Sequence, residues 1–180
     1  MPNAVEMLRE DHQKVKRLFE EFENAEGREK EQIVEKTVRE LEIHAALEEE
    51  IFYPAAEEQV DEKQSIDEAR EEHHVVKLLI GELKKMTAED ERYDAKYTVL
   101  AESVKHHIEE EESELFPKLE GKIDAEELGA EMETRKQELQ RQPSKRSGAR
   151  GVKSKSRSRG RKGRQTGTKK ARRKASGGRR

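Results

Sequence analysis

Histidine and glutamate residues recur in this chain at the spacing that places metal ligands on one face of a helix. His44 is followed four residues later by Glu48, and His107 is followed four residues later by Glu111. Side chains at positions i and i+4 lie one helical turn apart on the same face, so an imidazole and a carboxylate can reach one ion. The first pair leads into Phe-Tyr-Pro and the second into Leu-Phe-Pro. The duplicated pattern therefore predicts two equivalent metal-binding helices.

A further histidine precedes each pair at a nearly constant interval. His12 lies 32 residues before His44, and His73 lies 34 residues before His107. Together with the two glutamates they supply nitrogen and oxygen donors that suit two transition-metal ions. The alternative is that the histidines fill a helix interface while the glutamates cover a solvated face. Two copies in register favour the metal site, because burying such a polar cluster without metal would be costly.

Other polar residues stand close to the predicted ligands. His74 and His106 are sequence neighbours of ligands, about 100° away around the helix, so we expect them at the surface or behind the ligands. Either would replace its neighbour if the register differs by one residue. Asp11 and Glu72, each directly before a predicted ligand, are weaker candidates for orienting an imidazole, and Tyr53 is expected to be a packing residue. The remaining acidic residues near the motif are expected to cover a solvated face: Glu49, Glu50, Glu109, Glu110 and Glu112.

The elements that must position these ligands are helices. Apolar residues at spacings of three and four recur through residues 1–142, and nothing reads as a strand. Gly27 and Gly121 are expected to end helices, and Pro54 to end or bend one. We expect an all-α fold, an up-down-up-down four-helix bundle of two pseudo-symmetric helical hairpins, with the ligands in its core. A shorter, polar fifth helix from Asp124 to about Leu139 is expected at the periphery.

Charge divides the chain at Pro143. Residues 143–180 hold 17 of the 38 basic residues and none of the 41 acidic ones, so residues 1–142 carry a formal charge of −20. With one aliphatic side chain larger than Ala, this segment cannot bury enough apolar surface to offset the cost of ordering, so we expect a disordered tail. Its composition favours salt-sensitive, sequence-independent binding to DNA or RNA phosphates over folding back on the acidic part or a role in solubility alone. The predicted nucleic-acid contacts are Lys145, Arg146, Arg150, Lys153, Lys155, Arg157, Arg159, Arg161, Lys162, Arg164, Lys169, Lys170, Arg172, Arg173, Lys174, Arg179 and Arg180.

Composition excludes several classes of protein. The chain has no cysteine, which excludes disulfides, thiolate ligands and iron–sulfur clusters. Its first residues lack the features of a secretory signal, and no apolar run approaches the roughly 18 residues that span a bilayer. We expect a metal-binding domain over residues 1–142, a tail over residues 143–180, a cytoplasmic or nucleoid-associated location, and no membrane partner.

With these motifs laid out, residues 1–142 resemble the hemerythrin-like HHE cation-binding family. The resemblance rests on Asp-His12, His44-x3-Glu48 before Phe-Tyr-Pro, Glu-His73, and His107-x3-Glu111 before Leu-Phe-Pro. It implies a four-helix bundle with a non-haem di-iron centre that binds or reacts with dioxygen, peroxide or nitric oxide, or senses iron. The four histidines would be terminal ligands, and the two glutamates would bridge two iron ions. Ligand type alone also accommodates manganese or zinc.

One position departs from the oxygen-carrying hemerythrins, which place a further histidine one turn after the histidine of the third helix. Here that position is Lys77, and Lys16 stands at the equivalent place in the first half. A charged ammonium has no lone pair and cannot bind a metal, so we expect these lysines to contact Glu48 and Glu111 or to face solvent. A smaller ligand set leaves open coordination positions, which favours reactivity over reversible oxygen carriage. An enzyme, an iron or oxygen sensor, and a nucleoid-associated protein that uses the bundle as a scaffold all remain consistent with these residues.

Overall fold

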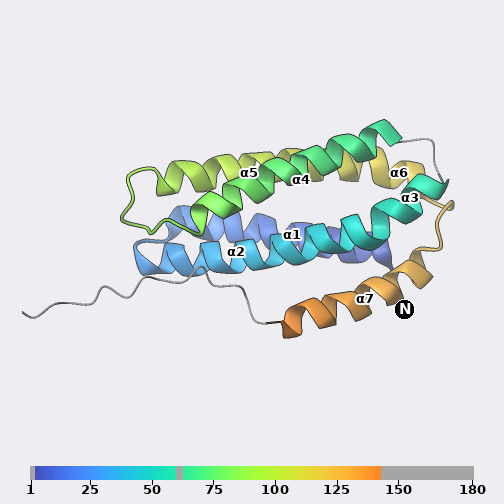
Figure 1. The fold of residues 1–180 in the computed structure, drawn as a ribbon, viewed down its shortest axis with the longest axis horizontal. Helices are drawn as coiled ribbons and strands as arrows, with labels where there is room; N and C mark the ends of the chain where they lie inside the picture. The colour runs from blue at the N-terminus through green and yellow to red at the C-terminus, as the bar shows by residue number, and fades with distance from the viewer. Residues whose placement is uncertain (1–2, 60–62, 143–180) are drawn as a thin grey trace, which may run out of the picture. The chain divides into compact units, whose positions relative to one another are not determined.

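The computed structural model describes residues 3–59 and 63–142, and every regular element in these ranges is helical. The predicted boundary at Pro143 and all the predicted nucleic-acid contacts lie outside the described residues. Four long helices form the bundle in Figure 1: α1 (Ala4–Asn24), α2 (Arg28–Leu47), α4 (Lys63–Leu83) and α5 (Tyr93–Glu110). Helix α1 packs on α2 and α4 packs on α5, while contacts of α1 with α5 and of α2 with α4 join the two hairpins. The predicted all-α bundle is confirmed.

The ends of the helices follow local sequence signals. Asn3 caps α1, because its side chain accepts a hydrogen bond from the backbone N–H of Glu6 at 3.2 Å. Gly27 separates α1 from α2 with a φ of 50°, and Gly121 has a φ of 71°, both in the left-handed region that favours glycine. Within the described ranges, no helix is both long and apolar enough to cross a membrane.

The second helix of each hairpin continues through one π-helical turn. These turns and the helices after them are η1 (Glu48–Phe52) with α3 (Tyr53–Gln59), and η2 (Glu111–Leu115) with α6 (Phe116–Leu119). Each turn has a hydrogen bond between residues five apart, from Tyr53 N–H to the Glu48 carbonyl and from Phe116 N–H to the Glu111 carbonyl. A proline follows one residue later, where its ring would clash with the carbonyl four residues back in an unbroken α-helix. Pro54 therefore does not end the helix, which continues to Gln59.

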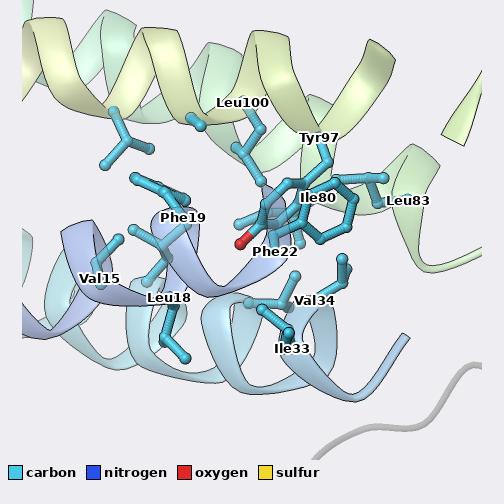
Figure 2. Close-up of a cluster of buried hydrophobic side chains, with 14 of the residues drawn as sticks. Val15, Leu18, Phe19, Phe22, Ile33, Val34, Ile80, Leu83, Tyr97 and Leu100 are labelled. Carbon is cyan, nitrogen blue, oxygen red and sulfur yellow. The ribbon is translucent and has the colours of Figure 1, made fainter. Parts of the chain in front are cut away.

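Apolar side chains form two buried clusters along the bundle. The first contains Phe19, Phe22 and Tyr97, and Figure 2 shows these side chains with their aliphatic neighbours from both hairpins. The second contains Leu8 and Phe52 and includes residues of α3, α6 and the last helix. Along each helix, the predicted histidine ligand is flanked on one side by residues of the first cluster and on the other by residues of the second. In α1, for example, His12 lies between Leu8 of the second cluster and Val15 of the first. The polar layer therefore separates two apolar regions.

The last helix, α7 (Ala125–Arg141), is an integral part of the fold. It packs against α1, α2 and η1, and its Met132 is fully buried in the second cluster. Arg39 of α2 donates hydrogen bonds to the carbonyls of Leu139 at 2.6 Å and Gln142 at 2.7 Å, at the end of α7. As predicted, this helix is polar and lies outside the four-helix bundle, and of its residues only Gly129 and Met132 are buried.

Candidate metal centre

The six predicted ligands lie together in the bundle core. All of them are buried, with at most 6% of any residue exposed. His12 comes from the middle of α1 and His73 from the middle of α4, while His44 and His107 lie near the ends of α2 and α5. The glutamates are the first residues of the two π-helical turns. The helices thus direct all six side chains into one layer.

Within this layer the imidazoles form two pairs. The Nε2 atoms of His12 and His44 are 3.1 Å apart, and those of His73 and His107 are also 3.1 Å apart. Ligand atoms at about 2.1 Å from one metal ion, at right angles to each other, are about 3 Å apart. Each pair therefore has the separation expected of two nitrogen ligands to one cation.

Glu48 lies between the two imidazole pairs. Its Oε1 is 3.1 Å from His44 Nε2, and its Oε2 is 3.3 Å from His73 Nε2. The side chain is fully buried, yet neither oxygen has a partner in hydrogen-bonding geometry. A buried carboxylate without hydrogen bonds is costly, and a cation beside each oxygen would lower that cost. The donor set therefore fits two cations bridged by this carboxylate.

Glu111 faces both imidazole pairs with a single oxygen, whereas Glu48 faces each pair with a different oxygen. Its Oε2 is 3.5 Å from both His12 Nε2 and His107 Nε2 and has no hydrogen-bond partner. Its Oε1 accepts a 2.8 Å hydrogen bond from the hydroxyl of Tyr53. Tyr53 was expected only to pack, so this contact is an addition to the predicted site. The equivalent position in the second half is Phe116, which has no hydroxyl, so the carboxylates of Glu48 and Glu111 have different surroundings.

Carboxylates also contact the outer nitrogens of the α1 and α4 imidazoles. His12 Nδ1 is 2.8 Å from Glu112 Oε1, and His73 Nδ1 is 2.9 Å from Glu49 Oε1. Such a contact fixes the imidazole tautomer and leaves the Nε2 lone pair directed at the metal position. The prediction that Glu49 and Glu112 belong to a solvated face is therefore wrong. Each sits one residue after a predicted ligand, Glu48 or Glu111, and reaches a histidine of the other hairpin.

The remaining two imidazoles have acidic neighbours as well. Glu72 Oε2 is 2.8 Å from His107 Nδ1, whereas Asp11 Oδ2 is 3.9 Å from His44 Nδ1. Asp11 is held instead by Lys136 of α7, whose Nζ donates at 2.7 and 2.8 Å. Sequence reasoning missed Lys136. The signal that could have found it is its position one turn after the buried Met132, which places it on the packed face of α7.

Protonation in the metal-free layer is strongly perturbed. Burial disfavours a charged imidazole at His44, but the charges of Glu48, Asp11 and Glu111 outweigh burial and raise the pKa of His44 to about 10. Burial likewise opposes ionisation of Glu48, but His44 and His73 hold the pKa of Glu48 well below its ordinary value. Without metal the layer is therefore held by buried imidazolium–carboxylate attraction.

Lys16 and Lys77 contact the outer carboxylates. Lys77 Nζ donates to both oxygens of Glu49, at 2.5 and 2.6 Å. Lys16 Nζ lies 3.9 Å from Glu112. Neither lysine reaches the bridging glutamates named in the sequence prediction, because each is directed at the acidic residue one position further along. The lysines therefore offset the charge of the carboxylates that orient His12 and His73.

The two extra histidines lie outside the ligand layer. His74 is exposed. The side chain of His106 is 64% exposed, and its Nε2 is 3.3 Å from Glu110 and 3.7 Å from Glu72. The predicted register, with His73 and His107 turned inward, is thus the one seen in the structure.

Comparison with known proteins identifies the family of this chain and a solved structure with a similar fold. The family model for the hemerythrin HHE cation-binding domain matches residues 3–119. A crystal structure of a hemerythrin HHE cation-binding domain-containing protein from Mycobacterium kansasii is similar, with a TM-score of 0.66 and 25% identity, covering 77% of this chain and 88% of that one. A DNA nickase from Nostoc sp. strain PCC 7120 is 27% identical over 125 residues. That match includes 69% of this chain, which spans only about a third (35%) of the length of the nickase.

Proposed function

Because the chain belongs to the hemerythrin HHE cation-binding domain family, we propose that its histidine and glutamate layer holds a non-haem di-iron centre that handles dioxygen, peroxide, nitric oxide or iron. The observation that carries this proposal is the arrangement of Glu48. One oxygen of this buried carboxylate faces each imidazole pair, and neither oxygen is hydrogen-bonded. Nitrogen and oxygen donors of this kind suit iron, and they also accommodate manganese or zinc.

Each part of the site has a definite task in this proposal. His12 and His44 would hold one ion, His73 and His107 the other, and Glu48 would contribute one oxygen to each. When bound, iron supplies open coordination positions for a small ligand and can cycle between the ferrous and ferric states. The apolar clusters on both sides of the layer keep bulk water away from it.

In this proposal, Tyr53 determines which oxygen of Glu111 is free to bind metal. Its hydroxyl donates a hydrogen bond to Oε1 of Glu111, while Oε2 faces both imidazole pairs. Burial, together with the charges of Glu48 and Glu111, raises the pKa of Tyr53 well above its ordinary value. The hydroxyl therefore stays protonated and remains a donor. This hydrogen bond would orient Glu111 so that Oε2 is the oxygen available to a metal ion.

Elemental analysis of protein purified without oxygen tests the metal assignment. Two irons per chain retained through gel filtration are expected for the wild type and for the control His74→Ala, which alters an exposed histidine. The double variant His44→Ala/His107→Ala removes one imidazole from each pair and should lose both irons. Absence of metal from the wild type, or equal metal in the double variant, would overturn the proposal.

Reaction with peroxide separates the modes of action. An enzyme should consume peroxide catalytically, and Glu48→Ala should abolish that turnover because it removes the bridge. A sensor should instead show little turnover but lose much of its folding stability when the metal is removed, since bound metal contributes to folding free energy. Turnover that survives Glu48→Ala would exclude the centre as its source.

We further propose that the basic segment 143–180 brings the metal centre to nucleic acid. Its 17 basic and no acidic residues support this, as does the likeness to a relative named DNA nickase. Gel-shift titrations across salt should show that the full chain binds DNA and that a chain ending at Gln142 does not. The affinity of the full chain should fall steeply with salt concentration. Equal weak binding by both chains would refute the proposal.

The alternative is a nucleoid-associated protein in which the bundle serves as a scaffold. In that case, DNA binding and compaction by the full chain would survive replacement of all six ligands. If the metal centre is the functional unit, the same replacement abolishes chemistry with oxygen species and leaves DNA binding intact. The two assays on one variant therefore separate the two functions.

A further inference from the structure

The two hairpins repeat the same ligands but differ on one outer face. Helix α7 covers this face of the first hairpin by packing on α1, α2 and η1. Apolar residues of α1, α2 and η1 share the second buried cluster with Met132 of α7, among them Met7, Leu8, Ile43, Leu47 and Ile51. When His12 is aligned with His73 and His44 with His107, the equivalent residues of the second hairpin are Glu68, Ala69, His106, Glu110 and Glu114. Figure 1 shows no helix of the described chain over this second face.

The uncovered face opens toward the ligand layer. A cavity of about 60 Å³ has His107 and Glu111 among its lining residues, together with the acidic Glu68, Glu72 and Glu110. One water needs only about 10–15 Å³ measured in this way, so the cavity admits several waters or a partly hydrated ion. Among its described lining residues there is no lysine or arginine. A cavity of this composition attracts cations.

Two residues that line this cavity, Glu72 and Glu110, could bind a cation together with the exposed His106 beside them. The Nε2 atom of His106 is 3.3 Å from Glu110 Oε1 and 3.7 Å from Glu72 Oε1. The ligand atoms of the three residues all lie within 4.8 Å of one another. These separations allow one ion to contact an imidazole nitrogen and two carboxylate oxygens, a donor set that suits divalent transition metals.

Two contacts connect this cluster to the centre. Glu72 uses its other oxygen, Oε2, to accept from Nδ1 of His107 at 2.8 Å. Glu111 lines the same cavity, is only 2% exposed, and has an Oε2 atom without a hydrogen-bond partner. An ion leaving the outer cluster would therefore meet a buried, unpaired carboxylate oxygen next.

We propose that Glu72, His106 and Glu110 form an outer entry site that binds a divalent transition-metal ion from solvent and delivers it through the cavity to the buried centre. The delivery step rests on the proposed function, because it requires that the six inner residues bind metal. The outer site itself does not depend on that requirement. The first hairpin lacks such a site, because Ile43 and Leu47 stand in place of His106 and Glu110, and Asp11, the equivalent of Glu72, is hydrogen-bonded by Lys136 of α7.

Isothermal titration calorimetry of the metal-free full chain with Co²⁺ measures the number of ions bound per chain. The wild type should bind three ions, His106→Ala/Glu110→Ala two, and His44→Ala/His107→Ala one. Both residues of the outer variant are solvent-accessible, so folding should be preserved, and circular dichroism checks this. The control Glu20→Ala/Glu23→Ala removes two exposed acidic residues of α1 and should bind three ions. Equal stoichiometry in the wild type and the outer variant would overturn the entry site.

Stopped-flow absorption of Co²⁺ entering the inner sites measures delivery. The outer variant should load more slowly by about tenfold, the low end of the rate effects of electrostatic focusing, while the control loads at the wild-type rate. Unchanged loading in the outer variant would overturn the delivery role. Failure of the inner centre gives a different result, with one Co²⁺ bound by the wild type and none by the outer variant. The two proposals are thus separately refutable.

Discussion

The hydroxyl of Tyr53 makes a hydrogen bond whose loss should be unusually costly in the metal-free protein. It donates at 2.8 Å to Glu111 Oε1, and at most 3% of either residue is exposed. The substitution Tyr53→Phe keeps the ring and leaves that buried carboxylate oxygen without a partner. Phe116 stands at the equivalent position of the second hairpin, so a phenylalanine is compatible with this type of environment.

The expected magnitude follows from burial and charge. A hydrogen bond to a charged group contributes about 1.5–3 kcal/mol to stability, and water cannot replace the hydroxyl at so buried a site. We therefore expect a loss near the upper end, about 2–3 kcal/mol. The matched control is Tyr97→Phe, which removes a buried 2.8 Å hydrogen bond to the neutral hydroxyl of Thr37 and should cost about 1 kcal/mol.

Urea unfolding of the two metal-free variants, followed by circular dichroism, measures this difference. Saturation with Mn²⁺ should reduce the cost of Tyr53→Phe, because bound cations offset the charge of Glu111, and should leave the cost of Tyr97→Phe unchanged. If Tyr53→Phe costs no more than the control without metal, the reasoning about the buried carboxylate is refuted. If Mn²⁺ does not reduce its cost, Glu111 does not contact the metal.

Four further predictions concern protonation and α7. The pKa of His44 is near 10 without metal, so metal binding at pH 7 should release protons, and metal affinity should rise with pH up to about 10. Calorimetry that shows no proton release would contradict this. The same raised pKa stabilises the metal-free fold fully below about pH 6.5, and this stabilisation should be lost as pH rises toward 10, which urea midpoints will show. Replacing Lys136 with methionine removes the two hydrogen bonds that it donates to the buried carboxylate of Asp11 and should cost about 1–3 kcal/mol, whereas an unchanged urea midpoint would mean that solvent compensates. The substitution Met132→Ala should cost about 2–5 kcal/mol if α7 is integral to the core, and under 0.5 kcal/mol if it is peripheral.

The ligand layer was predictable because its spacing is visible in the chain. The interval from His44 to Glu48 matches one helical turn, and the second copy from His107 to Glu111 repeats it. Periodic apolar residues then required helices that bring the two copies together. Local spacing and duplication were therefore sufficient to predict both the fold class and the inward orientation of the histidines.

The supporting contacts were not predictable, since they depend on relations between helices. Glu49 and Glu112 look like their acidic neighbours in the sequence, and only the packing of the hairpins shows which glutamate meets an imidazole of the opposite hairpin. Lys136 belongs to a helix with a weak apolar pattern, so its approach to Asp11 required knowing where α7 packs. Tyr53 offered no sequence sign that its hydroxyl would face Glu111.

The two π-helical turns bear on how the protein arose. Such a turn is equivalent to one residue inserted into an α-helix, and here the insertion begins at the predicted glutamate ligand in both hairpins, at Glu48 and at Glu111. Two independent insertions at one position are a less economical history than a single ancestral hairpin that already contained the extra residue and was then duplicated. A pair of such hairpins would already have supplied both imidazole pairs and both carboxylates. We infer that the halves diverged after such a duplication, since α7 packs on the first hairpin and the acidic cavity lies in the second.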